Sequence, residues 1–261
     1  MRRVFFALFL MTSACSWGSG SAWMKEPIAP EEGGRNFGSS GGGAPSTRAA
    51  SRTIGDRPAG AGESGAPTND KTGGGGRVLG TFRNTYYDFP SEKEFSGPPI
   101  SLMNAKCQPI AQVPRTFYEA ACVQGSGALA AGGTVSFAKR DCACAEVCPR
   151  TSQKICFDAL DRSQFPWGRG AAGTPITPLR SVAADTHVLP MGTVLYIPEL
   201  DGVEGSDGCF VVEDRGSRVQ GEHVDIFTGE PARTRTLNSL VPSNQGITVV
   251  VDAPACGRLR R

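Results

Sequence analysis

The chain has little excess charge of either sign and no apolar run long enough to cross a membrane as a helix. Its 27 Lys and Arg residues are balanced by 25 Asp and Glu residues, giving a formal net charge of +2. A strongly basic surface, on which nucleic-acid binding depends, is therefore not expected, and we expect no nucleic-acid partner. The apolar stretch at residues 4–11 is far shorter than the roughly 20 residues that span a bilayer.

The start of the chain has the pattern of an export signal. Two arginines precede the short apolar run, so residues 1–22 are interpreted as a signal. Residues 12–15 (TSAC) resemble a bacterial lipobox, in which Cys15 becomes the lipid-bearing first residue. The alternative is ordinary cleavage after GSA at residues 20–22, which would remove Cys15. We expect lipidation at Cys15, hence a membrane partner through the lipid and a place in the outer membrane or cell envelope, facing the periplasm.

Residues 23–76 contain almost no large apolar side chains. Gly, Ser, Ala and Pro dominate there, with scattered charges. Such a segment cannot bury enough apolar surface to offset its conformational entropy. We therefore predict a disordered tether, followed by one folded domain over residues 77–261.

The cysteines favour disulfides over a metal. Without Cys15, eight remain, at positions 107, 122, 142, 144, 148, 156, 209 and 256. An even number suits an oxidising compartment, although the pairing cannot be deduced. A zinc cluster is the alternative, but Cys142 and Cys144 are one residue apart and no histidine is near, which fits structural zinc spacing poorly.

Short runs rich in β-branched and aromatic residues, bounded by Gly, Pro or Asp, predict many strands. They cover residues 77–89, 134–139, 180–185, 193–198, 209–214, 223–229 and 246–252. Helix is expected only over residues 232–240 and 157–162. This pattern favours an all-β fold, either a barrel or a sandwich. The long segment at about 95–170 is predicted to be a cysteine-rich insertion, stapled because its own core is thin.

Three acids share one kind of position, on or at the end of an apolar strand. Asp185 and Asp214 end their strands, and Asp225 lies inside one, on the same face as His223 and Phe227. Clustered, buried carboxylates raise the proton affinity of at least one member, as a general acid near neutral pH requires. The alternative is that each aspartate caps a turn.

The order of these motifs resembles the three-aspartate (3D) domain family. Residues 173–185 end in Ala-Asp, 189–200 carry a Pro-x-Gly-Thr strand, and 209–229 contain an Asp-x-Gly turn followed by the last acid-bearing strand. LGTFRNTYYDF (79–89) is similar to the family's opening strand. The resemblance covers roughly residues 77–252.

The resemblance implies a six-stranded double-psi β-barrel that acts on peptidoglycan glycan strands. Members cleave the bond between N-acetylmuramic acid and N-acetylglucosamine and leave a 1,6-anhydromuramoyl end. The family's single acid/base maps to Asp214, with Asp185 and Asp225 tuning its pKa and holding sugar hydroxyls. No cofactor and no metal are implied.

Other residues are weaker candidates. Thr174 and Thr177 could line a substrate cleft, and Trp167 could stack on a sugar ring or anchor a loop on the barrel. We expect His223 on a strand surface. His187 lies two residues after Asp185 and is not assigned to the site.

Two departures from the family keep a second function open. Nothing plainly corresponds to the second domain of the larger transglycosylases, so the insertion either forms the other wall of the site or covers it. Arg215 places a cation beside Asp214, which would lower the pKa of that acid and make it a poorer proton donor. A non-catalytic peptidoglycan-binding or wall-organising barrel is therefore the alternative, and a metal-binding module the third.

Overall fold

The computed structural model describes residues 75–259. The expectations for residues 1–22, for lipidation at Cys15 and for the tether up to residue 74 lie outside the described residues. The described residues all fall in one compact unit, which holds every element described below.

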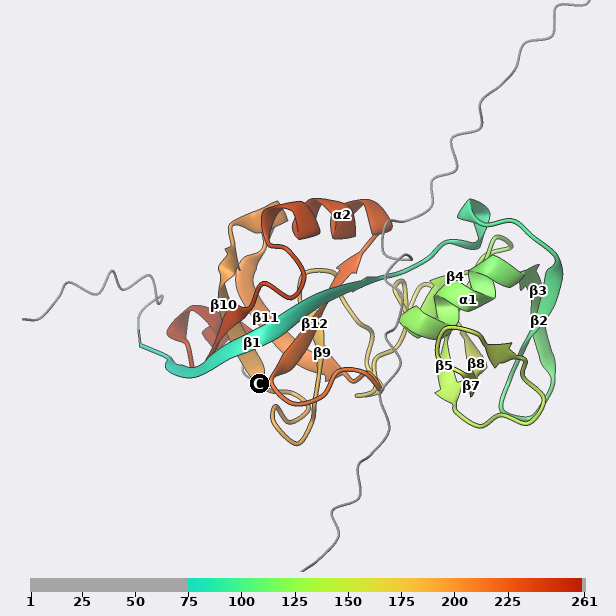
Figure 1. The fold of residues 1–261 in the computed structure, drawn as a ribbon, viewed down its shortest axis with the longest axis horizontal. Helices are drawn as coiled ribbons and strands as arrows, with labels where there is room; N and C mark the ends of the chain where they lie inside the picture. The colour runs from blue at the N-terminus through green and yellow to red at the C-terminus, as the bar shows by residue number, and fades with distance from the viewer. Residues whose placement is uncertain (1–74, 260–261) are drawn as a thin grey trace, which may run out of the picture. The chain divides into compact units, whose positions relative to one another are not determined.

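Six strands close into a barrel (Figure 1). In barrel order they are β1 (Arg77–Asp88), β12 (His223–Gly229), β9 (Ser181–Ala184), β11 (Asp207–Asp214), β10 (Val194–Asp201) and β13 (Ile247–Val251). Each corresponds to one of the strands predicted from the sequence. The predicted six-stranded double-psi barrel is confirmed, and the described residues also contain two ten-residue helices.

The barrel mixes parallel and antiparallel neighbours. β1 runs parallel to β12, and β9 runs parallel to β11, while the other four pairs of neighbours are antiparallel. β12 shows the expected alternation: Val224 and Ile226 point into the main barrel core, and Phe227 belongs to a second apolar cluster on the other side. Both faces of β12 are therefore covered.

The interior of the barrel is filled by one large apolar core. Its fully buried members include Phe82, Leu195 and Phe210, with apolar side chains from all six strands. The helix α2 (Pro231–Leu240), at the place predicted for it, adds Leu237 to this core. One disulfide, Cys209–Cys256, ties β11 to the short 3-10 helix η4 (Pro254–Leu259).

The segment between β1 and β9 forms small sheets around one helix. In chain order its elements are η2 (Glu92–Glu94), β2 (Pro99–Met103), β3 (Pro109–Pro114), α1 (Arg115–Gln124), β4 (Ser126–Ala128), β5 (Thr134–Lys139), β6 (Val147–Cys148), β7 (Gln153–Lys154) and β8 (Cys156–Leu160). The sheets are β2-β3, β4-β5-β8 and β6-β7. They pack with α1 around a separate core that includes Phe117 and Phe157.

The predicted disulfides are confirmed. Three of them, Cys107–Cys144, Cys122–Cys148 and Cys142–Cys156, lie inside the insertion. The sulfur atoms of positions 107, 142 and 144 are close enough together to hold a metal ion, but all three are in disulfides and supply no free thiolate.

Two expectations about the insertion were wrong. Residues 157–162 do not form a helix, because residues 156–160 are β8, paired to β5 with Phe157 opposite Phe137. The helix α1 was not predicted. It follows Pro114 and ends at Gly125, whose φ of 83° is the left-handed conformation that commonly closes a helix.

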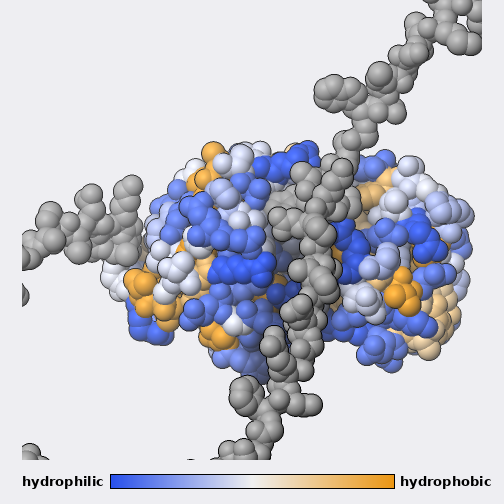
Figure 2. Space-filling model, in the orientation of Figure 1, coloured by the Kyte–Doolittle hydropathy of each residue, from blue (hydrophilic) through white to orange (hydrophobic). Residues whose placement is uncertain are grey.

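The large apolar side chains on the surface are scattered along the chain. They are Val78, Val123, Val147, Val188 and Leu240. The face seen in Figure 2 is mostly hydrophilic over the described residues, with small apolar spots. Within residues 75–259, no helix combines the length and the apolar character that a membrane crossing requires.

Candidate active site

Asp214 ends β11 and is held from three directions. Its Oδ1 accepts hydrogen bonds from the backbone N–H of Arg215 (2.8 Å) and of Ala171 (3.0 Å). Its Oδ2 accepts a longer bond, 3.3 Å, from the Tyr87 hydroxyl of β1. One carboxylate oxygen is thus fixed by two backbone donors, while the other meets a single, longer contact.

The loop that supplies Ala171 crosses the end of β11 very closely. The backbone N–H of Ala172 donates to the Glu213 carbonyl at 3.1 Å, and a Cβ placed on Gly170 would lie 2.3 Å from that same oxygen. Only glycine allows this approach at position 170. The loop from the insertion therefore contributes directly to the surroundings of Asp214.

Asp225 lies in the middle of β12, opposite Thr85 of the parallel strand β1. The Thr85 hydroxyl is 2.7 Å from Asp225 Oδ1 and 2.8 Å from His223 Nε2. Both acids affect the same tyrosine: burial raises the pKa of Tyr87, and the charges of Asp214 and Asp225 raise it further. The structure thus brings Asp214 and Asp225 into one electrostatic environment.

Asp185 has a different setting. It follows β9, where its Oδ2 accepts the backbone N–H of Gly221 at 2.8 Å and its Oδ1 accepts that of His187 at 3.0 Å. The His187 ring, whose side chain is 95% exposed, also lies 3.0 Å from Oδ1. Gly221 has a φ of +65°, so the turn between β11 and β12 needs glycine there. Asp185 holds this turn in place.

The pKa values of the three acids shift in different directions. Burial raises the pKa of Asp225 to about 7, with the charge of Asp214 adding to the rise and the Thr85 hydrogen bond opposing it. Burial also raises the pKa of Asp214, against the backbone donors of Arg215 and Ala171, the Tyr87 hydroxyl and the Arg215 charge. The pKa of Asp185 is lowered, first by the Gly221 hydrogen bond.

The other sequence candidates lie in the segment between β8 and β9. Trp167 packs edge-on against Phe89 and Phe227, with ring centroids 5.6 and 6.3 Å away, in the second apolar cluster. Thr174 and Thr177 are exposed in the loop before β9. The contacts of Trp167 are those of a residue that anchors a loop, and sugar stacking by it stays a prediction.

The sequence interpretation was wrong about His223 and missed two residues. His223 is only 5% exposed, because the face of β12 opposite the main core is itself covered. Thr85 and Tyr87 contact the acids but were not singled out. The signal that could have found them is the alternation of β1, which places positions 85 and 87 on one face, opposite the buried Tyr86.

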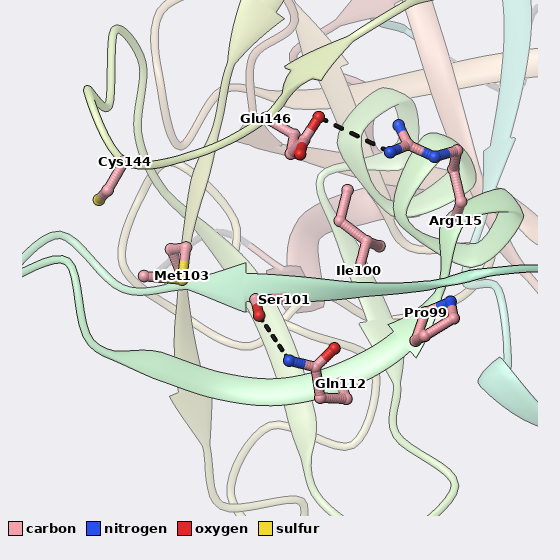
Figure 3. Close-up of a pocket in the computed structure, with 8 residues that line it drawn as sticks. All are labelled: Pro99, Ile100, Ser101, Met103, Gln112, Arg115, Cys144 and Glu146. Carbon is pink, nitrogen blue, oxygen red and sulfur yellow. Dashed lines mark hydrogen bonds and ion pairs between the residues drawn. The ribbon is translucent and has the colours of Figure 1, made fainter.

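A shallow pocket of about 440 Å³ lies in the insertion rather than at the acids (Figure 3). Arg115 and Glu146 form an ion pair of 3.7 Å across it, and Gln112 donates to Ser101 at 2.6 Å. Its lining contains none of the residues predicted as site residues.

The comparison with known families identifies part of this barrel. A family model described as the 3D domain matches residues 180–241, which contain all three acids. The chain contains a 3D domain. This confirms the resemblance that the motifs at Asp185, Asp214 and Asp225 indicated.

The 3D domain is similar to part of a named enzyme. The membrane-bound lytic murein transglycosylase A of Vibrio cholerae is 35% identical over 68 residues, which are 23% of this chain and 18% of the relative. The matched part is therefore less than a fifth of the length of that curated relative.

Solved structures with a similar fold carry related names. MltA from E. coli with bound chitohexaose aligns with a TM-score of 0.46 and 18% identity, over 66% of this chain and 71% of that one. The membrane-bound lytic murein transglycosylase from Agrobacterium tumefaciens aligns with a TM-score of 0.40 and 18% identity, over 58% and 54%. Similarity at this level does not bear on the activity of this chain.

Proposed function

We propose that the protein is an exported enzyme that cleaves peptidoglycan glycan strands by lytic transglycosylation, with Asp214 as the acid/base. The observation that carries the proposal is the pair of acids, Asp214 on β11 and Asp225 on β12 of the 3D domain, both with pKa values raised by burial. A raised pKa is what a carboxylic acid needs to donate a proton near neutral pH.

In the proposed reaction Asp214 acts twice. Its protonated Oδ2 gives a proton to the oxygen between N-acetylmuramic acid and N-acetylglucosamine, and the C1–O bond breaks with its electron pair going to that oxygen. The C6 hydroxyl of the muramyl residue then attacks C1 and loses its proton to the Asp214 carboxylate. The product is a 1,6-anhydromuramoyl end, formed without water, which differs from ordinary glycoside hydrolysis.

The remaining residues are assigned supporting roles. The Tyr87 hydroxyl, 3.3 Å from Oδ2, orients the oxygen that carries the proton. Asp225 adjusts the proton affinity of the pair. Asp185 fixes the turn after Asp214 through Gly221. Thr174 and Thr177, in the exposed loop before β9, are proposed to contact the glycan.

A second candidate function is glycan binding without cleavage. It is favoured by the two backbone donors on Asp214 Oδ1 and by the Arg215 charge, because all three stabilise the ionised carboxylate. In this case the acids hold sugar hydroxyls, and the protein organises or binds the wall. Both proposals include export to the cell envelope, with lipid anchoring through Cys15.

Digestion of purified peptidoglycan sacculi by the oxidised protein separates the two. We expect the wild type to release anhydro-muropeptides, identified by mass spectrometry, and Asp214→Asn to reduce their release at least 100-fold. Glu222→Gln is the matched control, because it removes one exposed negative charge from the same turn. Pelleting of folded wild type with sacculi, with no soluble product, would favour the binding function.

A further inference from the structure

The loop that supplies a backbone donor to Asp214 is attached to one cross-strand pair of the insertion. Ser136 of β5 stands directly opposite Asp158 of β8. The backbone N–H of Arg169 donates to Ser136 Oγ at 3.0 Å, and Arg169 Nη2 donates to Asp158 Oδ2 at 2.5 Å. Arg169 therefore contacts both members of this pair, one with its backbone and the other with its side chain.

The serine half of this attachment is buried. Ser136 is fully buried, and its Oγ lies 2.8 Å from the Oγ of Ser126 in β4. A Cβ placed on Gly168 would lie 2.3 Å from Ser126 Oγ, and Gly168 has a φ of +100°, so this position needs glycine. The backbone just before Arg169 thus lies directly against the sheet β4-β5-β8.

The four residues after Arg169 form a tight turn that reaches the end of β11. A 2.9 Å hydrogen bond between its last N–H and its first carbonyl closes the turn at residues 170–173, which we call the donor turn. Ala171, one of its two central residues, donates its N–H to Asp214 Oδ1 at 3.0 Å. Because Arg169 immediately precedes the donor turn, its two contacts fix where the turn begins.

We propose that Arg169 is a positioning residue for Asp214: by holding the start of the donor turn on the insertion, it keeps the Ala171 N–H on Asp214 Oδ1. The sheet β4-β5-β8 then has a role in the site, because it determines where this donor lies. The part that this donor plays in catalysis rests on the proposed function.

The two donors on Asp214 Oδ1 differ in how they are held. The N–H of Arg215 is next to Asp214 in the chain, whereas that of Ala171 is 43 residues away and depends on the donor turn. A backbone N–H on a carboxylate oxygen favours the ionised form. The Ala171 hydrogen bond accordingly lowers the pKa of Asp214, against the rise caused by burial. Release of the turn removes this donor and leaves that of Arg215.

One variant separates positioning from a simple effect of charge. The side chains of Arg169 and Asp158 are 29% and 41% exposed, so breaking their ion pair leaves neither charge buried without water. Asp158→Ala removes a negative charge, which by charge alone would lower the pKa of Asp214. Release of the donor turn has the opposite effect, because the ionised Asp214 loses the Ala171 donor. The direction of the change therefore distinguishes the two.

Nuclear magnetic resonance of the full protein with labelled aspartate measures this change without substrate. We expect Asp158→Ala to raise the titration midpoint of the Asp214 carboxyl by about 0.5–1 pH unit. Arg169→Gln is expected to raise it as well, whereas Arg169→Lys, which can still pair with Asp158, stays closer to the wild type. Arg162→Gln is the matched control, because it removes an exposed arginine from the same segment, and it is expected to leave the midpoint unchanged.

A lower or unchanged Asp214 midpoint in Asp158→Ala would overturn the proposal. If that variant does not fold, Arg169→Gln and the wild type decide. In the wild type, the chemical shift of the Ala171 amide proton is expected to follow the Asp214 titration with the same midpoint. An Ala171 amide that ignores this titration, or an unchanged midpoint in Arg169→Gln, would also overturn it.

Release of anhydro-muropeptides from sacculi is followed against pH in the same proteins. Since the proposed acid must be protonated to act, a higher Asp214 midpoint shifts the alkaline limit of release upward by the same amount. A raised midpoint in the variants, with no release by the wild type, would reject the proposed function and keep the positioning role. Release by the wild type, with an unchanged midpoint in the variants, would reject the positioning role alone.

Discussion

The barrel and the insertion are stabilised by different kinds of interaction. Every barrel strand has a hydrogen-bonded neighbour on both sides, and one core of 17 buried residues fills the interior. The insertion has three sheets of two or three strands with open edges and a core of 11 buried residues. Three of the four disulfides lie in the insertion. Covalent links thus accompany the thinner core.

This difference matters for the site because the acid pair is built from both regions. Asp225 and Tyr87 stand on barrel strands with large cores beneath them, whereas Ala171, which donates to Asp214, belongs to the loop that follows the insertion. The barrel positions the acids. The loop that follows the insertion supplies one of the hydrogen bonds that favour ionisation of Asp214.

Reduction of all disulfides is expected to have the largest effect, and to affect the insertion more than the barrel. Cross-links that close loops of 14 to 37 residues each stabilise by about 3–4 kcal/mol in the chain-entropy description, so the insertion loses three such contributions and the barrel one. We expect amide hydrogen exchange to show loss of protection in residues 99–160 while the six barrel strands stay protected.

The matched control is Cys209→Ala with Cys256→Ala in the oxidised protein. Its loop of 47 residues is the longest of the four, so its entropic contribution is at least as large. Retained protection across the whole chain in this variant would support the comparison. Simultaneous loss of protection in both regions on reduction would show that they unfold together.

A matched pair of core phenylalanines tests the size of the two cores. Phe210 of the barrel and Phe157 of the insertion are both fully buried. Truncation of either to Ala is expected to cost about 3–5 kcal/mol. We expect Phe210→Ala to lower the denaturant midpoint of a barrel that still folds, and Phe157→Ala to leave the insertion without protection from exchange. Equal behaviour of the two variants would contradict this.

Local patterns in the sequence were sufficient to predict the strands of the barrel. Runs of β-branched and aromatic residues bounded by Gly, Pro or Asp placed all six strands. Alternation then assigned the side chains of residues 223–229 to the two faces of their strand. The positions of Asp185, Asp214 and Asp225 on or beside those strands followed directly. What alternation cannot give is which strands pair: Thr85 and Asp225 are 140 residues apart, and only the parallel register of β1 and β12 joins them.

The same limit explains the errors. His223 was assigned to the surface, but it is only 5% exposed, and its Nε2 lies 2.8 Å from Thr85 Oγ1 of the neighbouring strand. In the insertion, the segment at residues 157–162 was misassigned because disulfides and β5, rather than its own propensity, determine its conformation. Short elements fixed by cross-links leave little periodic signal.

The smallest predicted effect concerns the residue where the chain leaves the barrel. Asp88 ends β1, accepts a hydrogen bond from Thr234 of α2, and its backbone N–H donates to Gln124 of α1 in the insertion. Burial raises its pKa to about 6. Because the folded protein binds this proton more tightly than the unfolded chain, the stability from Asp88 is full below pH 4 and falls as pH rises to about 6.

Asp88→Asn removes that loss, and since the carboxyl is partly accessible we expect it to stabilise the protein by about 1–2 kcal/mol at pH 7 and by little at pH 3. Unfolding at both pH values, followed separately in barrel and insertion amides, shows where the gain falls. A gain confined to the barrel means that the two regions unfold independently. In that case the hydrogen bond from Asp88 to Gln124 does not couple them. A gain in both means that Asp88 couples them, and that the insertion shares the pH dependence of the barrel.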